Sequence, residues 1–475
     1  MLLSGDRAAV LVLCTIGVSS LGCTSESSSS GLSAGPGPET SGTTISASSG
    51  VTTKSASSAT NTGSDSGFAD DDTSDGQPDT VCGDGVTEGI EACDDSNTSD
   101  GDECSADCAV FRREIPLGVY GVTYDHARDA QGTIHALWKS GGTLRYGTLV
   151  DGAIVGAEDI PSSNGSNIRF KRPRIAVSPD GETVHTCWNG LPGVALEYAR
   201  RDEDGRWTRQ AVWQQPVGTQ FVAVAAIGAD LDGAVHIIAQ RWDEGVTPSP
   251  VVYFRKPSAA EAWSAPQTIQ AAEGKQWRDT SIFVDDLGGV HATWKTGARP
   301  GQYRSVASGG DLSAAATITI PTPPDPAIDT VSFGDLFVTA QADVHHVFVT
   351  YPLQQLWYEV RREDTGDFGE PSLVGPLDND EALGYENPWP AVAVDVHGRV
   401  FASWSENRGG GTISHVVLAT FDGQQWIRHD VTNSADIDVN SAPAMTVVDD
   451  LVHLVYSNLD GEQVLVQYRY SPPAG

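Results

Sequence analysis

Basic residues are scarce in this chain of 475 residues, and it contains only two methionines. Lysine and arginine together number 29 against 63 aspartates and glutamates, so the formal net charge is -34. A surface of this sign repels nucleic acid and anionic lipid headgroups. We therefore expect no nucleic-acid partner, and we interpret the acidity mainly as a contribution to solubility outside the cell.

Motifs that specify a reaction are also missing from the main part of the chain. Residues 109–475 contain neither a G-x-S-x-G nucleophile elbow nor an H-E-x-x-H pair for zinc. No other spacing of nucleophile and base in this region points to a reaction. The sequence therefore favours a binding protein over an enzyme.

Long apolar stretches are absent, and the one short run lies at the N-terminus. Residues 8–18 form an apolar segment too short to span a bilayer as a helix, as in a signal-peptide core. The following Ser20-Leu21-Gly22-Cys23 resembles the lipobox of bacterial lipoproteins, although Ser20 stands where leucine is usual. The resemblance implies that residues 1–22 are removed and that Cys23 is lipidated. An ordinary signal peptide is the alternative.

Residues 23–80 lack hydrophobic periodicity. Ser, Thr and Gly make up 30 of the 44 residues from 24 to 67, and an Asp-rich stretch follows. Such a composition cannot bury enough apolar surface to fold. We predict a disordered stalk that holds the rest of the protein away from a membrane.

Residues 81–108 form a cysteine-rich segment with the spacing C-x10-C-x10-C-x3-C. Four clustered cysteines in an exported chain predict two disulfides, with three pairings possible. The runs C-G-D-G, C-D-D and C-S resemble the myxobacterial-type cysteine-rich repeat. Crowded side-chain oxygens suggest calcium as a ligand, with plain turn formation as the alternative. The expected disulfide cysteines are Cys82, Cys93, Cys104 and Cys108, and the expected calcium ligands are Asp84, Asp94, Asp95, Asn97 and Asp102.

From about residue 115 a pattern recurs every 50 to 56 residues. A typical copy has a short apolar strand, an Asp/Gly turn, a strand of the type Val-His-x-x-Trp and a strand of the type Leu-x-Tyr. Four-stranded units at this period are typical of propeller blades. The anchors of the second strands are His135, His185, His236, His291, His345, Phe401 and His453. Seven anchors predict an all-β fold, a seven-bladed β-propeller over residues 109–475.

The last repeat lacks a fourth strand. Residues 110–115 have the pattern of that missing strand, so we expect the N-terminal segment to close the ring. The repeats resemble the BNR-type repeats of sialidase-superfamily propellers, on turns such as Phe421-Asp-Gly-Gln-Gln-Trp426. This resemblance implies the fold and does not assign an activity.

The repeated histidines and tryptophans are interpreted as structural. One histidine per blade cannot bring ligands together around one metal, so packing or a turn hydrogen bond is expected. Cys187, which has no partner, is expected to be a buried and inert thiol. Aromatic residues outside the repeat register are better candidates for ligand binding. The candidate binding residues are Trp389, Glu386, Trp277 and Trp242, with Trp213 as a further aromatic.

We predict a lipid-anchored, membrane-bound protein of the cell envelope, facing the periplasm or the cell surface and most consistent with the outer membrane. Its propeller would bind a glycan, a peptide or a protein, and calcium in the cysteine-rich segment is the only cofactor expected. The alternatives are a sialidase-like glycoside hydrolase and a structural component of an envelope complex. A hydrolase would use loop acids such as Asp325, Asp329, Asp378 and Glu381, and arginines from among Arg172, Arg174, Arg278, Arg304 and Arg408.

Overall fold

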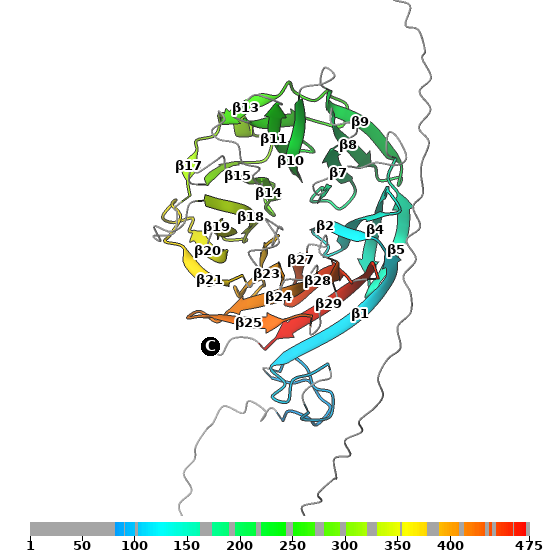
Figure 1. Cartoon of the computed structure of the whole chain (residues 1–475), viewed down its shortest axis with the longest axis vertical. Coiled ribbons are helices and arrows are strands. Elements are labelled where there is room, and N and C mark those ends of the chain that lie inside the picture. The colour runs from blue at the N-terminus through cyan, green and yellow to red at the C-terminus, as the bar shows by residue number, and fades with distance from the viewer. Residues whose placement is uncertain are drawn as a thin grey trace, which may run out of the picture. The chain divides into compact units, whose positions relative to one another are not determined.

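The computed structural model shows a nearly all-β chain with seven sheets arranged in a ring (Figure 1). The predicted seven-bladed propeller is therefore confirmed. The structure describes residues 81–89, 91–99, 103–161, 173–189, 195–214, 220–243, 250–270, 280–294, 301–320, 330–351, 354–377, 389–407, 413–432, 437–438, 443–458 and 460–471. The leader, Cys23 and the predicted stalk lie outside these residues. No helix in the described part of the chain is both long enough and apolar enough to cross a bilayer.

Each blade is an antiparallel sheet whose first strand lies nearest the centre of the ring. Blade 1 comprises β2 (Val122–Arg128), β3 (Ile134–Ser140), β4 (Thr143–Val150) and β5 (Ala153–Asp159). Blade 2 comprises β6 (Arg174–Val177), β7 (Val184–Asn189), β8 (Ala195–Arg201) and β9 (Trp207–Gln214). Blade 3 comprises β10 (Gln220–Ala229), β11 (Val235–Asp243), β12 (Val251–Lys256) and β13 (Gln267–Gln270).

The next three blades follow the same order along the chain. Blade 4 comprises β14 (Thr280–Val284), β15 (Val290–Trp294), β16 (Gln302–Val306) and β17 (Ile318–Thr319), with a short 3-10 helix at Leu312–Ala314. Blade 5 comprises β18 (Thr330–Val338), β19 (Val344–Tyr351), β20 (Gln355–Arg361) and β21 (Ser372–Pro376). Blade 6 comprises β22 (Ala391–Val394), β23 (Val400–Asn407), β24 (Ile413–Phe421) and β25 (Trp426–Asp430), with β26 (Ile437–Asp438) paired to β24.

Blade 7 is built from both ends of the described chain. Its strands are β27 (Ala444–Val448), β28 (Leu451–Ser457), β29 (Glu462–Tyr470) and, outermost, β1 (Val110–Tyr120). Val110 lies opposite Tyr470, and Pro116 lies opposite Val464. The predicted closure of the ring by the N-terminal segment is thus confirmed. Pairing of β1 with β29 removes one of the open edges that would otherwise recruit other chains.

The turn between the first two strands explains the recurring Asp and Gly. In blade 1 the Oδ1 of Asp129 accepts the backbone N–H of Gln131 at 3.0 Å and that of Thr133 at 2.7 Å. Gly132 has a φ of 85°, a conformation that glycine adopts without a Cβ clash. The same arrangement recurs at Asp230, Asp285 and Asp395. The Asp and Gly therefore set the turn geometry.

The repeated histidine completes this turn from the second strand. In blade 4 the Nε2 of His291 lies 2.9 Å from Oδ2 of Asp285, and its Nδ1 lies 2.7 Å from the hydroxyl of Tyr303. Equivalent His–Tyr contacts of 2.7–2.8 Å occur in blades 1, 2, 3 and 5. In blades 1, 3 and 4 the ring therefore links the turn to the third strand, and the structural role expected of the histidines is confirmed.

Two blades depart from the His–Tyr pairing. In blade 6 the anchor is Phe401, and the residue at the tyrosine position, opposite Ser403, is Leu418. In blade 7 the position opposite Val455 is occupied by Leu465. Tyr468 of the same strand lies three residues further on. Tyr468 instead pairs with Val452 and accepts a hydrogen bond from Nε of Arg112 at 3.1 Å.

The core consists of the interfaces between successive blades. Between blades 2 and 3, for example, Cys187, Leu196 and Tyr198 of one sheet pack with Ile227 and Ile237 of the next. The tryptophans expected in the core are buried, with Trp138, Trp188, Trp294 and Trp404 all at most 2% exposed. The Cys187 thiol is fully buried, and burial raises its pKa to about 12, so it is an inert thiol as expected.

The cysteine-rich segment contains two disulfides, as predicted. Cys82 pairs with Cys108 and Cys93 pairs with Cys104, which selects one of the three possible pairings. Cys104 also forms an isolated β-bridge with Phe111 in β1, and the Ser105 N–H donates to the Val110 carbonyl at 2.9 Å. The segment is therefore joined by backbone hydrogen bonds to the strand that closes the propeller.

Candidate functional site

A cavity of about 390 Å³ lies along the axis of the propeller. The first strands of all seven blades line it, so it is the central channel. Its volume falls in the range of roughly 300–1,000 Å³ found for small-molecule sites. We take this channel as the candidate functional site.

One register position of the inner strands contributes four polar side chains to the channel. In each blade, the anchor residue lies in the second strand. The position in question is the inner-strand residue that pairs with the residue two places after that anchor. It is occupied in chain order by Asp125, Arg174, Ala226, Ser281, Asp335, Ala391 and Ala444. Blades 1, 2, 4 and 5 therefore contribute polar side chains, whereas blades 3, 6 and 7 contribute alanine.

This position is the first or second residue of the inner strand in blades 2, 4, 6 and 7, and it lies farther along the strand in blades 1, 3 and 5. It lies at the end of the cavity away from the Asp/Gly turns. In an antiparallel blade, the connections between the second and third strands and between successive blades meet at that same end. We call it the loop end, and the opposite one the turn end. Many of the loop-end connections lie outside the described residues.

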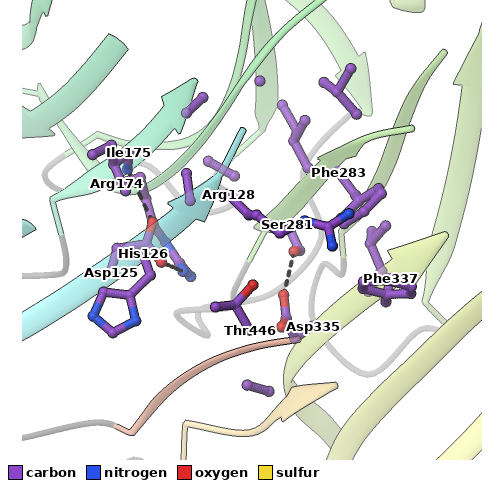
Figure 2. Close-up of a pocket in the computed structure, with 18 of the residues that line it drawn as sticks. Asp125, His126, Arg128, Arg174, Ile175, Ser281, Phe283, Asp335, Phe337 and Thr446 are labelled. Carbon is purple, nitrogen blue, oxygen red and sulfur yellow. Dashed lines mark hydrogen bonds and ion pairs between the residues drawn. The ribbon is translucent and has the colours of Figure 1, made fainter. Parts of the chain in front are cut away.

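Asp125 and Arg174 form one polar pair, from blades 1 and 2. Nη1 of Arg174 lies 3.5 Å from Oδ1 of Asp125, and Oδ2 of Asp125 accepts the backbone N–H of Ile175 at 3.0 Å. Their side chains are 16% and 19% exposed, so the ion pair is largely sheltered yet reachable from the channel. Figure 2 shows Asp125 and Arg174 close together on one wall.

Ser281 and Asp335 form the second polar pair, from blades 4 and 5. The Ser281 hydroxyl donates to Oδ1 of Asp335 at 2.9 Å, and Oδ2 of Asp335 accepts the N–H of Val392 in blade 6 at 3.4 Å. Figure 2 shows this pair on a different side of the cavity from Asp125 and Arg174. Among the described residues, Asp335 has hydrogen bonds but no ion pair, so its negative charge is not balanced by a basic side chain.

Trp389 lines the channel directly before β22. Its φ of 41° lies in the left-handed region, which glycine adopts readily and bulky residues seldom adopt. Such strain concentrates at functional sites, where the surrounding structure maintains it. Of the four binding residues expected from sequence, the structure places Trp389 at the channel.

The other three expected binding residues are not placed there by the described structure. Glu386 and Trp277 lie outside the described residues, as do the loop acids Asp325, Asp329, Asp378 and Glu381. Trp242 belongs to β11, but its side chain is not described. Trp213 packs in the core between blades 2 and 3, with its ring 6.0 Å from that of Phe254, so it is not a ligand contact there.

The arginines considered for a sialidase do not gather in the described channel. Arg174 is paired with Asp125, and Arg304 bonds to the carbonyls of Leu312 and Ser313 and lies over the Trp294 ring. Arg172, Arg278 and Arg408 lie outside the described residues. Arg128, toward the turn end, also lines the channel and donates to the Val447 carbonyl at 3.0 Å.

His126 is a channel-lining residue that the sequence pattern did not indicate. Among the described residues, neither of its ring nitrogens has a hydrogen-bond partner. Burial lowers its pKa to about 3, with a smaller contribution from nearby His453. A general base works best when its pKa is near the operating pH, so this imidazole is poorly suited to proton abstraction.

The expected calcium ligands mostly hold the turns of the cysteine-rich segment. The Asp94 carboxylate accepts the N–H groups of Gly83, Asp84, Gly85 and Ser96 at 2.8–3.1 Å. The bond from Ser96 is the largest cause of a pKa for Asp94 below the usual value. Asp84, Asp95 and Asn97 each accept the N–H two residues further on, and Asp102 lies outside the described residues. These contacts support turn formation, and calcium binding stays a prediction.

No protein-family model matches the chain, and no curated protein matches its sequence. Among solved structures, the chain is similar to the BP39L lectin from Burkholderia pseudomallei, with a TM-score of 0.53 and 13% identity over 75% of this chain and 98% of the lectin. A streptogramin B lyase gives a TM-score of 0.46 at 11% identity, covering 75% of this chain and 97% of that one. A Hadza microbial sialidase gives 0.42 at 12% identity, covering 71% and 77%. Identities this low support the propeller fold alone.

Proposed function

We propose that this protein is a lipid-anchored binding protein of the cell envelope, and that its ligand binds at the loop end of the propeller channel. The observation that carries the proposal is the uneven distribution of polar and apolar side chains around this channel. Two polar pairs, from blades 1 and 2 and from blades 4 and 5, meet one strained tryptophan at the end of the channel where blades 3, 6 and 7 contribute alanine. A concave apolar site with a few convergent polar groups is the usual form of a ligand pocket.

Binding fits the described side chains better than catalysis. The Asp125 carboxylate is held by Arg174 and by the Ile175 N–H, and Asp335 is held by Ser281 and by the Val392 N–H. A glycosidase needs one carboxyl group of raised pKa beside an ionised partner. Both carboxylates are thus held as fixed hydrogen-bond acceptors, a role that suits ligand binding.

The disulfides and the leader support a location outside the cytoplasm. Disulfides persist in oxidising compartments, and this chain has two in its cysteine-rich segment. The short apolar leader and Cys23 provide export and lipid attachment in this proposal. The Ser/Thr-rich stalk then gives the propeller reach toward an external ligand.

The binding proposal is tested by screening the purified full-length protein in two ways. One screen measures hydrolysis of glycosides, including sialosides, and the other measures binding to glycans, peptides and envelope proteins. We expect binding without turnover, and we expect Trp389→Ala to weaken the binding roughly tenfold or more. Trp357→Ala is the matched control, because Trp357 is a partly buried tryptophan of β20 that does not line the channel.

Turnover of a glycoside that is lost in Glu381→Gln or Glu386→Gln would replace this proposal with the hydrolase alternative. Wild-type affinity in a folded Trp389→Ala variant, with thermal melting equal to that of the wild type, would show that the channel is not the site.

Lipid attachment is tested separately with Cys23→Ser. We expect this variant to lose labelling by a fatty-acid analogue and to leave the membrane fraction. Wild-type levels of both labelling and membrane association would contradict attachment at Cys23 and would place the lipid elsewhere in the chain.

A further inference from the structure

The loop end of the channel has one apolar side and two polar sides. Blades 6 and 7 supply Trp389, Pro390, Ala391, Pro443 and Ala444, a continuous apolar wall of small side chains and one large aromatic. The Asp125–Arg174 pair and the Ser281–Asp335 pair flank this wall. In the ring order, blade 3 separates the two pairs on one side, and blades 6 and 7 separate them on the other.

Asp335 connects the apolar wall to one of the polar pairs. Its Oδ2 accepts the N–H of Val392, three residues after Trp389, while its Oδ1 accepts the Ser281 hydroxyl. A single ligand can therefore contact Asp335 with a polar group while its apolar face lies on the Trp389 wall. An ionised carboxylate offers about four acceptor positions, so the hydrogen bonds that hold Asp335 leave acceptor capacity for a ligand.

This arrangement suits a molecule with an apolar face and hydroxyl groups around its edge. A pyranose ring has this character, because its C–H groups lie on the faces and its hydroxyls project outward. Aromatic side chains bind such faces, and paired carboxylate and guanidinium groups accept from and donate to neighbouring hydroxyls. A flat aromatic ligand lacks the edge hydroxyls, and an extended peptide would need backbone partners on the apolar wall.

Resting on the binding function proposed above, we propose that the loop end holds one pyranose unit of a neutral or amino-substituted saccharide. Its apolar face lies on the Trp389 wall, and its hydroxyl or ammonium groups meet Asp335 with Ser281 on one side and Asp125 with Arg174 on the other.

The charge of the site selects against carboxylated sugars. The charge of Arg174 is offset by Asp125, whereas Asp335 has no basic partner among the described residues. A uronic or sialic acid would bring a second carboxylate beside Asp335 in a sheltered site, where like charges repel strongly. An amino sugar would instead place an ammonium group beside that carboxylate.

The test uses the full-length protein and the methyl glycosides of glucose, galactose, mannose, glucosamine, N-acetylglucosamine, glucuronic acid and N-acetylneuraminic acid. Saturation-transfer NMR detects binding, and calorimetry gives the affinities. We expect at least one neutral or amino sugar to bind, about tenfold or more tighter than either carboxylated sugar. We expect Trp389→Ala and Asp335→Asn each to reduce that affinity roughly tenfold, and Trp357→Ala to leave it unchanged.

Asp335→Asn gives a second readout that a purely structural role would not change. Removing the charge while keeping the shape should narrow the gap between neutral and carboxylated sugars. Tighter binding of a carboxylated sugar by the wild type, or an unchanged gap in Asp335→Asn, would overturn the inference. So would the absence of binding to every sugar in the panel.

The two proposals fail in different ways. If no sugar binds but a peptide or envelope protein does, and that binding requires Trp389, the sugar inference is wrong while the binding function stands. If no ligand of any class binds and a glycoside is turned over, the proposed function itself is wrong. Thermal melting of each variant confirms that a loss of binding is not a loss of fold.

Discussion

The hydroxyl of Tyr358 lies 2.7 Å from Nδ1 of His345, and both side chains are at most 7% exposed. This contact joins the second and third strands of blade 5. Blade 6 has Phe401 and Leu418 at the same two positions, so the fold accepts either a hydrogen-bonded pair or an apolar pair.

Replacing the His345–Tyr358 pair of blade 5 by the Phe and Leu found in blade 6 gives a testable prediction. His345→Phe alone leaves the Tyr358 hydroxyl buried without its partner, at an expected cost of about 1–3 kcal/mol in the free energy of unfolding. Adding Tyr358→Leu should recover part of that loss, because both polar groups are then gone. Chemical denaturation of the two single variants and the double variant measures the coupling. Strictly additive losses would contradict the paired role.

The buried histidines make stability depend on pH. Burial lowers the pKa of His185 to about 3 and that of His345 to about 4, whereas an unfolded histidine titrates near 6.5. Below pH 6.5 the unfolded state therefore binds more protons than the folded state, so the free energy of unfolding falls as the pH falls from about 6.5 to about 4. Denaturation at pH 7.5, 5.5 and 4.5 should show this decline.

The double variant His345→Phe with Tyr358→Leu provides the control for the pH effect, because it removes one of these histidines. Its stability should fall less steeply over the same interval. The titration of Asp230 and Asp285 does not affect this comparison between pH 7.5 and pH 4.5. Burial alone would raise them, but hydrogen bonds, first from His236 and His291, keep them below their usual value. The stability they provide is lost only at still lower pH. Parallel curves for both proteins would contradict the histidine explanation.

The closing strand should contribute a large share of the propeller's stability. Deleting residues 109–116 removes most of the pairing between β1 and β29 and exposes an edge of blade 7. We expect a large fall in melting temperature and a tendency to aggregate, whereas deleting residues 24–67 should change little. A milder probe is Arg112→Ala, which removes hydrogen bonds to the Tyr468 hydroxyl and the Val431 carbonyl and should cost about 1–3 kcal/mol. Equal melting temperatures for the two deletions would refute this role of β1.

Asp94 and Asp95 should respond differently to substitution. Because the Asp94 carboxylate accepts four backbone N–H groups, Asp94→Ala should increase proteolysis of the cysteine-rich segment both with calcium and with a chelator. Asp95→Ala should alter only the protection that calcium gives, if calcium binds. Calorimetric titration of the oxidised full-length protein checks the metal directly. No heat of binding at millimolar calcium would remove calcium from the description.

The repeated features of the fold could be predicted from the sequence, because they recur in several copies. The seven anchors gave the number of blades, and the missing fourth strand of the last repeat indicated the closing role of β1. The residue at the tyrosine position of blade 7 could not be identified from sequence, because only the register shows that it is Leu465 and not Tyr468. The disulfide pairing also required the structure, since spacing alone allows three pairings.

The channel residues were harder to predict, because each occurs once and each belongs to a different blade. The sequence contains one weak indication of the channel residues. Asp125, Ser281 and Asp335 each lie ten residues before the anchor of their repeat, and these anchors are His135, His291 and His345. Polar residues in an inner strand that is otherwise apolar mark the channel wall. Trp389 was found by its position outside the repeat register, but its strained backbone and its place beside the Asp335–Val392 contact appear only in three dimensions.

The pairing of Val110 with Tyr470 joins two residues that are 360 positions apart in the chain, the difference between their numbers. The chain is synthesised from its N-terminus, so β1 is made long before β29. Contacts of such sequence separation form late, because the entropy lost in closing the loop is repaid only after the intervening blades have folded. Until then blade 7 has an unsatisfied edge. Folding of this propeller therefore ends when β1 pairs with β29, and a chain truncated before β29 cannot complete blade 7.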